Sequence, residues 1–210
     1  MIEKVKKAKS IVERWVNRVY PMPSHFGDEK LKQRTKYKPD YKKLANSISK
    51  NIDFRSMIDI GCAQGFLMEL FLERNIKVKG IEVSEDAIKF APKRLKSHIE
   101  VGDFSQASGS YDLVCCVEVA EHIDPARSQE LVNKLCSLSE HYIYFTAAPP
   151  GQDGRGHINC RPHEKWMKWF NESKYFVNQS VTDKIKSDLE DVEYAEWLQG
   201  NSLLFQEMDK

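Results

Sequence analysis

Two carboxylates and two imidazoles are the side chains of this sequence best suited to chemistry. Glu118, Glu121 and His122 form an E-x-x-E-H pattern, and His157 follows within a Gly-rich segment. Carboxylates and an imidazole at the end of a strand can hold a divalent ion such as Mg²⁺ or Mn²⁺. Such an ion lowers the pKa of a bound hydroxyl. We therefore predict a metal site at Glu118, Glu121 and His122, and His122 and His157 as catalytic residues.

Other roles stay open for both histidines. His157 could act as a general base, as a fourth metal ligand or as a substrate-binding residue. It could instead pin its loop by hydrogen bonds, together with Asn159. His122 could line a pocket or cap the next helix without any metal.

A glycine turn forms the second chemical feature. Asp59, Gly61 and Gly65 follow the apolar residues 57–58 and precede an amphipathic run over 67–72. This order predicts a buried strand, a tight turn and a helix. Glycine has no Cβ, so the backbone can bend sharply and approach a ligand, while the helix N-terminus adds partial positive charge. The turn suits a nucleoside with a carboxylate or phosphate tail.

The glycine spacing narrows the ligand class. G-x-x-x-G differs from the G-x-G-x-x-G of dinucleotide enzymes and from a P-loop, which argues against an NAD oxidoreductase. Glu82 ends the next predicted strand, about 20 residues after the turn, where a carboxylate can accept hydrogen bonds from both ribose hydroxyls. The alternative is an ordinary exposed glutamate at a strand end.

The elements that would position these residues alternate along the chain. We expect further strands over 78–82, 99–101, 111–117 and 142–146, separated by helices over 85–95 and 125–138. Such alternation predicts a parallel, doubly wound sheet whose ligand lies at the carboxyl ends of the strands. The last third predicts a strand at 175–179, a helix over 181–197 and a strand over 202–208.

The first 50 residues predict a helical cover. Helical spacing of apolar residues indicates an amphipathic helix over 2–19, an irregular segment follows over 20–38, and a helix runs over 40–50. We therefore expect a covering, substrate-side segment over 1–50 and one globular unit over 51–210.

Four motifs in order resemble class I S-adenosylmethionine (SAM)-dependent methyltransferases. D-x-G-x-x-x-G at 59–65 is similar to motif I of that family, and Glu82, Asp103-Phe104 and the segment 111–123 match its later motifs. The resemblance covers roughly residues 56–150. It implies an α/β, Rossmann-like fold: a doubly wound, mostly parallel seven-stranded sheet with the last strand antiparallel.

The resemblance also implies which residues bind SAM. Asp103 would meet the exocyclic amine of adenine and Phe104 would line its ring. The implied cofactor-binding residues are Asp59, Gly61, Cys62, Gln64, Gly65, Phe66, Glu82, Val83, Asp103, Phe104 and Glu118. Because the segment before motif I often covers the cofactor in this family, four residues there are pocket candidates: Tyr20, His25, Phe26 and Tyr37. Tyr194 and Trp197 are further candidates.

The E-x-x-E-H segment resembles that of metal-dependent O-methyltransferases, namely the ubiquinone-pathway catechol type and the small-RNA 2′-O type. The small-RNA type uses a further histidine much later in its chain, and no residue here matches it by spacing. The resemblance implies O-methylation of a small hydroxylated molecule such as a sugar, a nucleotide-sugar or a phenol. The alternatives are an RNA 2′-O-methyltransferase and a non-catalytic SAM-binding protein.

Composition limits partners and location. The 210 residues carry a net charge of +1, but residues 1–50 hold 14 Lys and Arg against 5 Asp and Glu, which keeps nucleic acid open as a partner. Five cysteines without metal-type spacing indicate reduced thiols, and no apolar run is long enough for a membrane span. We expect a cytoplasmic protein without a membrane partner, as a monomer or homodimer.

Overall fold

The computed structural model describes residues 32–208. The expected helix over 2–19 and the pocket candidates Tyr20, His25 and Phe26 lie outside these residues. The division of the chain at residue 50 stays a prediction.

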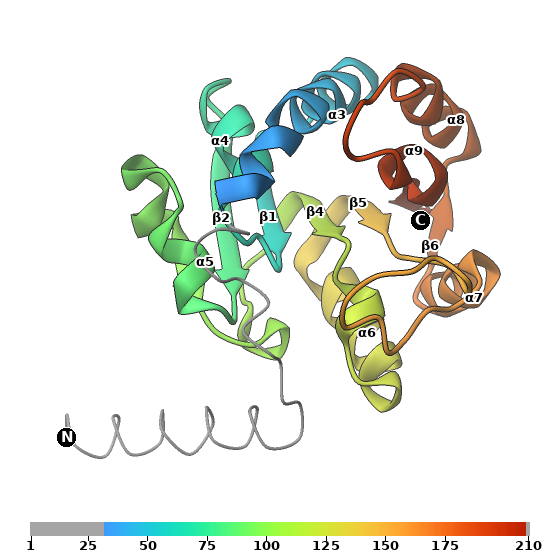
Figure 1. Cartoon of the computed structure of the whole chain (residues 1–210). Coiled ribbons are helices and arrows are strands. Elements are labelled where there is room, and N and C mark those ends of the chain that lie inside the picture. The colour runs from blue at the N-terminus through green and yellow to red at the C-terminus, as the bar shows by residue number, and fades with distance from the viewer. Residues whose placement is uncertain (1–31, 209–210) are drawn as a thin grey trace, which may run out of the picture.

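The described strands form one seven-stranded sheet in the order β3-β2-β1-β4-β5-β7-β6 (Figure 1). β7 runs antiparallel to both of its neighbours, whereas the other pairs are parallel. The predicted fold class is therefore confirmed. The strands are β1 Ser56–Ile60, β2 Lys77–Glu82, β3 Ile99–Val101, β4 Tyr111–Val117, β5 Ser139–Thr146, β6 Tyr175–Val177 and β7 Leu203–Glu207.

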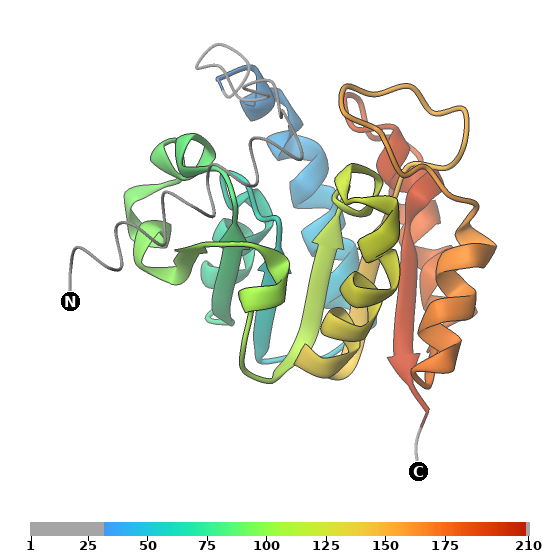
Figure 2. The same ribbon diagram turned by 90° about the horizontal axis from the view of Figure 1, so that it is seen from below.

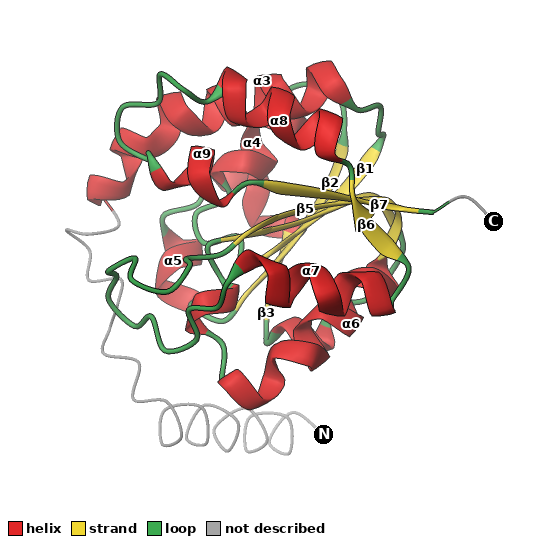
Figure 3. Cartoon of the chain, turned by 90° about the vertical axis from the view of Figure 1, so that its right-hand side faces the viewer, coloured by secondary structure: helices red, strands yellow, loops and turns green. Residues whose placement is uncertain are grey.

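Helices cover both faces of this sheet (Figure 3). The α-helices are α3 Lys38–Asn51, α4 Phe66–Leu72, α5 Glu85–Lys89, α6 Ser128–Leu138, α7 His163–Glu172, α8 Gln179–Asp188 and α9 Trp197–Asn201. Short 3₁₀ helices add η1 Arg34–Tyr37, η2 Lys93–His98, η3 Phe104–Gln106, η4 Ala120–His122 and η5 Pro125–Arg127. None of the helices in the described range is long and apolar enough to cross a membrane.

Two apolar cores follow from the alternation of side chains along the strands. Cys115 of β4 packs in the core under α3, α4, α8 and α9, and Cys116 packs in the core under α6 and α7. Because both faces of the sheet are covered, β4 is apolar along its buried length rather than alternating.

Two predicted helices end earlier than expected. The helix expected over 85–95 ends at Lys89, and a separate 3₁₀ helix begins after Pro92, which has no N–H to continue the helical ladder. The helix expected over 181–197 is divided into α8 and α9. Between them, the buried carboxylate of Asp40 accepts hydrogen bonds from the backbone N–H groups of residues 193–195, an interaction that stabilises a loop instead.

The strand order reverses between β1 and β4, so their carboxyl ends open a crevice at one edge of the sheet. The loop after β5 and the segment from η1 into α3 lie at this same edge (Figure 2). The predicted chemical residues should therefore meet there.

Candidate functional site

The glycine turn between β1 and α4 needs glycine at two positions. Gly61 and Gly65 both have φ +74°, a left-handed conformation that strains residues with a Cβ. A Cβ on Gly61 would lie 2.5 Å from Cγ2 of Val119. Val119 belongs to the Glu118–His122 segment, so this close approach joins the predicted cofactor turn to the predicted catalytic segment.

Glu82 is held at the end of β2 by two backbone groups. Oε2 accepts a hydrogen bond from the N–H of Ala63 at 2.8 Å, and Oε1 accepts one from the N–H of Ser84 at 2.8 Å. Burial raises the pKa of Glu82, although these hydrogen bonds and the charge of Arg34 lower it in part. Glu82 is therefore a buried carboxyl group that is held in a fixed position at the turn.

Asp59 lies beside Glu82 and is also buried. Burial, followed by the negative charge of Glu82, raises the pKa of Asp59 to about 8. Two carboxylates thus sit below one turn, a costly arrangement that marks functional sites more often than structural ones.

A small pocket opens above these carboxylates. Both Arg34 of η1 and Tyr41 of α3 line it. The remaining lining residues are Asp59, Gly61, Cys62, Ala63, Gln64, Phe66, Leu67 and Val117.

The predicted adenine end of the site lies at the start of η3. The Asp103 carboxylate binds Arg127 through two hydrogen bonds and caps η3, and the Phe104 ring is buried beneath the Arg127 guanidinium. Val83, after β2, keeps an exposed side chain. Phe104 can therefore contribute backbone rather than an open ring face, and sequence reasoning missed Arg127.

Glu118 adopts a left-handed conformation at the end of β4, with φ +53°. Its N–H donates to Oγ1 of Thr146, and its Oε1 accepts from Nδ2 of Asn201 at 3.1 Å. Asn201 also donates to Oε1 of Gln152 at 3.1 Å, so α9 ties Glu118 to the loop after β5. No sequence signal pointed to this buried asparagine.

Glu121 is the most unusual residue of the site. Its side chain is 0% exposed, and no donor within residues 32–208 forms a hydrogen bond of good geometry with either carboxylate oxygen, although the Glu118 side chain and the Ala148 backbone approach it. Burial, followed by the charge of Glu118, raises its pKa to about 9. A buried carboxyl group without well-formed hydrogen bonds is costly, and a ligand that binds it would offset that cost.

Two histidines face this carboxyl group. His157 Nε2 lies 4.0 Å from Oε1 of Glu121, and the His122 and His157 rings contact edge to face with centroids 5.0 Å apart. His122 Nδ1 bonds the carbonyl of Gly156, and His157 Nδ1 bonds that of Gln152. Carbonyls only accept, so each Nδ1 carries a proton, and in the neutral imidazole Nε2 carries the lone pair.

The potential ligand atoms of Glu121, His122 and His157 all lie within 4.8 Å of one another. Glu121 and His122 belong to the predicted metal site. One of the predicted roles of His157 is that of a fourth metal ligand. The structure brings these three together, whereas Glu118 points to Asn201.

Asn159 pins the loop that carries His157, as one predicted alternative requires. Its side chain donates to the carbonyl of Ala120 and to Oγ of Ser128, both at 2.9 Å. The N–H groups of Ile158 and Asn159 donate to the carbonyl of Glu121. The loop and the E-x-x-E-H segment therefore form one unit.

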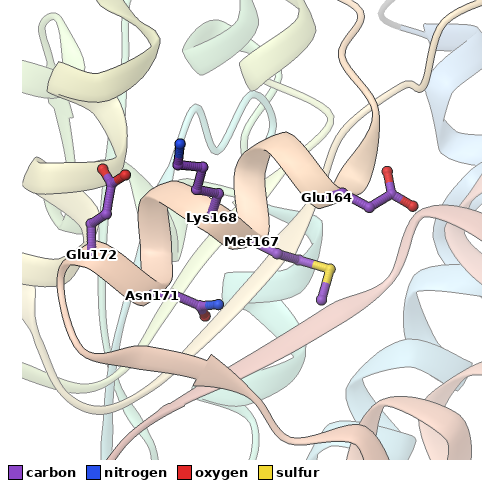
Figure 4. Close-up of a pocket in the computed structure, with 5 residues that line it drawn as sticks. All are labelled: Glu164, Met167, Lys168, Asn171 and Glu172. Carbon is purple, nitrogen blue, oxygen red and sulfur yellow. The ribbon is translucent and has the colours of Figure 1, made fainter.

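Two other features of the structure do not involve the predicted site residues. Asp112, Glu140 and His141 also cluster, but Asp112 is at the opposite end of β4, where it accepts from the backbone of Arg55 and Ser56. A shallow hollow runs along α7, lined by Glu164, Met167, Lys168, Asn171 and Glu172 (Figure 4). None of these residues is a predicted site residue.

Known sequences match the middle of the chain. Residues 58–136 match the family described as methyltransferase domain. The ubiquinone biosynthesis O-methyltransferase of Nitrosomonas europaea is 33% identical over 102 residues, 44% of this chain and 43% of that protein. Its mitochondrial counterpart in Saccharomyces cerevisiae is 29% identical over 96 residues, 40% of this chain and 31% of that protein. The chain spans less than half the length of these curated relatives.

Solved structures match nearly the whole chain. Magnesium protoporphyrin IX methyltransferase from Synechocystis, with bound SAM, has a TM-score of 0.64 at 16% identity and covers 95% of this chain and 97% of that one. A SAM-dependent methyltransferase from Archaeoglobus fulgidus has a TM-score of 0.63 at 17% identity, covering 86% of this chain and 100% of that one. At these identities the likeness is one of fold.

Proposed function

We propose that this chain is a SAM-dependent methyltransferase that methylates a hydroxyl oxygen of a small molecule. Residues 58–136 match the methyltransferase domain, and the fold is that of solved SAM-dependent methyltransferases. The observation that carries this proposal is the buried carboxyl group of Glu121, which has no well-formed hydrogen bond within the described residues. It faces two imidazole nitrogens beside the glycine turn.

The residues at the turn fit SAM. Gly61 gives the turn its left-handed backbone, and the fixed carboxylate of Glu82 can accept the ribose hydroxyls. Asp59 and the Arg34 cation flank the same pocket. When bound, SAM supplies an electrophilic methyl group, while the chain supplies position and a site that excludes water.

The histidine pair supports activation of an oxygen acceptor. With both Nδ1 atoms donating to carbonyls, Nε2 of His157 can accept the proton of an acceptor hydroxyl. Glu121 lies next to this nitrogen, and a proton gained by the imidazole would favour the ionised form of Glu121, which would in turn stabilise the imidazolium. The backbone around both groups is fixed by Asn159.

A divalent cation fits the same three side chains. Glu121, His122 and His157 would hold it, and its charge would favour the ionised form of Glu121 and of an acceptor hydroxyl. Two imidazoles favour a transition metal over Mg²⁺, so among the predicted ions we prefer Mn²⁺.

The acceptor class rests on the relatives. Those that match by sequence are named ubiquinone biosynthesis O-methyltransferases, and the catechol class of acceptor follows from the E-x-x-E-H segment. We therefore propose a small phenol or another hydroxylated molecule. A cytoplasmic location, supported by five free cysteines, belongs to the same proposal.

RNA 2′-O-methylation is the second candidate, and one observation favours it. The small-RNA type pairs E-x-x-E-H with a further histidine, and His157 lies in contact range of that segment although its spacing along the chain differs. The basic residues of the first 50 positions are compatible with an RNA partner.

A methyl-transfer assay with labelled SAM separates these possibilities. The acceptors are catechols, hydroxylated sugars, and short RNA ending in either a 2′-hydroxyl or a 2′-deoxy sugar, each with Mn²⁺, Mg²⁺ or chelator. We expect turnover of a catechol with Mn²⁺, lost in His157→Ala and kept in His141→Ala, an exposed histidine at the far end of the sheet. Transfer only to RNA with the 2′-hydroxyl would favour the second candidate. SAM binding without any turnover would favour a non-catalytic protein.

A further inference from the structure

The carboxylate of Asp103 is engaged almost completely by its own chain. Oδ1 accepts from the N–H of Ser105 at 3.0 Å, from its Oγ at 2.6 Å and from Nη2 of Arg127 at 2.8 Å. Oδ2 accepts from Nη1 of Arg127 at 2.9 Å. A carboxylate offers about four lone-pair sites. Oδ2 has one donor whereas Oδ1 has three, so Oδ2 is the oxygen that can accept a further hydrogen bond from a ligand N–H.

Arg127 is itself held rigidly. Its guanidinium lies 4.3 Å from the centroid of the Phe104 ring, and its Nε and Nη2 donate to Glu130 at 2.7 and 2.9 Å. The planar fork thus binds two carboxylates while one face covers an aromatic ring, a role that lysine, with its single ammonium group, can reproduce only in part.

Stability alone accounts poorly for this arrangement. The Arg127 and Asp103 side chains are 30% and 27% exposed, so solvent screens part of what this ion pair adds to stability. The electrostatic effect is clearer: burial raises the pKa of Asp103, but the bonds from Arg127 and Ser105 outweigh it and hold that pKa below its usual value. Asp103 therefore stays an acceptor-only anion.

We propose that Arg127 is a positioning residue for the purine end of SAM: it clamps Asp103 so that Oδ2 alone faces the ligand and accepts the exocyclic amine of adenine. This proposal rests on the proposed function, because it requires SAM in the crevice. Arg127 would thereby set the preference for adenine over purines that lack the amine.

Titration calorimetry with two ligands tests the proposal. One is S-adenosylhomocysteine and the other is its inosine analogue, in which an oxo group replaces the amine. The proteins are wild type, Arg127→Met, Arg127→Lys and the control Arg94→Met, which removes another arginine bound to two carboxylates. We expect Arg127→Met to weaken the adenosine ligand about tenfold, leave the inosine ligand unchanged, and lose the preference. Arg127→Lys should recover part of it.

An equal loss for both ligands would overturn the proposal, because a merely structural role weakens them alike. A second check uses Asp103→Asn: adding Arg127→Met to it should change neither affinity further, and a full additional loss would contradict action through Asp103. Failure of wild type to bind either ligand would instead overturn the proposed function itself.

Discussion

His157 Nε2 lies 4.0 Å from Oε1 of Glu121, although the two side chains come from different loops at the carboxyl edge of the sheet. Glu121 is fully buried, and the neighbouring Gly156 and Gln152 carbonyls fix the tautomers of His122 and His157. Because Glu121, His122 and His157 lie together, they form a candidate site for oxygen activation.

Replacing Gly154 should disturb this geometry without touching the cofactor turn. A Cβ there would fall 2.1 Å from Nε2 and Cε1 of His157, so Gly154→Ala must displace the ring. We expect turnover to fall by ~100-fold, the lower end of the contribution of general acid–base catalysis, with unchanged S-adenosylhomocysteine affinity. Gly200→Ala, where a Cβ meets nothing within 4 Å, is the control. Full activity of Gly154→Ala would remove His157 from the reaction.

The Glu121 carboxyl group should make stability depend on pH. Its pKa of about 9 lies above the ordinary value, so the folded state binds more protons than the unfolded state between about pH 5 and 9. The stabilisation is complete below that window and is lost as pH rises through it. The melting temperature of Glu121→Gln minus that of wild type should therefore increase by roughly several degrees between pH 6 and pH 9. A constant difference would contradict a neutral, buried carboxyl group.

Local patterns were enough to predict the sheet and the glycine turn. Strands β2 to β4 lie within a residue of their expected positions, and Gly61 and Gly65 have the backbone angles that a tight turn requires. Pro92 also explains in retrospect why α5 is short. The fold class is confirmed and residues 58–136 match the methyltransferase domain, while the roles of individual site residues stay predictions.

Contacts between distant segments could not be predicted in the same way. Arg127 on Asp103, Asn201 on Glu118 and Asp40 on residues 193–195 each join positions far apart in the chain. Their residue types are common on protein surfaces, and only the folded sheet brings the partners together. The proximity of His157 to Glu121 belongs to this class.

Asp40 should stabilise the loop between α8 and α9. Its carboxylate accepts hydrogen bonds from the N–H groups of Glu193, Tyr194 and Ala195. Asp40→Ala leaves these groups unpaired and should lower the free energy of unfolding by ~2 kcal/mol, measured by urea denaturation. It should also speed hydrogen exchange at residues 193–195. Asp191→Ala, which removes an exposed carboxylate near Lys43, should leave both quantities unchanged. Equal behaviour of the two variants would refute this role.

Gly61 should be intolerant of substitution for two separable reasons. Gly61→Ala adds left-handed strain, of order 1–3 kcal/mol, and a clash with Val119, whereas Gly151→Ala at φ +88° adds strain alone because nothing lies within 4 Å. Gly61→Ala should therefore be the less stable variant and lose S-adenosylhomocysteine affinity. Adding Val119→Ala should recover part of the stability. Equal stability of the two glycine variants would contradict the close approach of Val119.

The cofactor assignment at the glycine turn is the central claim, and titration calorimetry of S-adenosylhomocysteine tests it most directly. Wild type should bind with micromolar affinity. Glu82→Gln should bind at least tenfold more weakly, because a carboxylate that accepts two ribose hydroxyls loses one acceptor. Glu100→Gln, on the next strand and paired with Lys79 at the surface, should bind like wild type. Equal affinity of wild type and Glu82→Gln, or no binding by wild type, would contradict a SAM site at this turn.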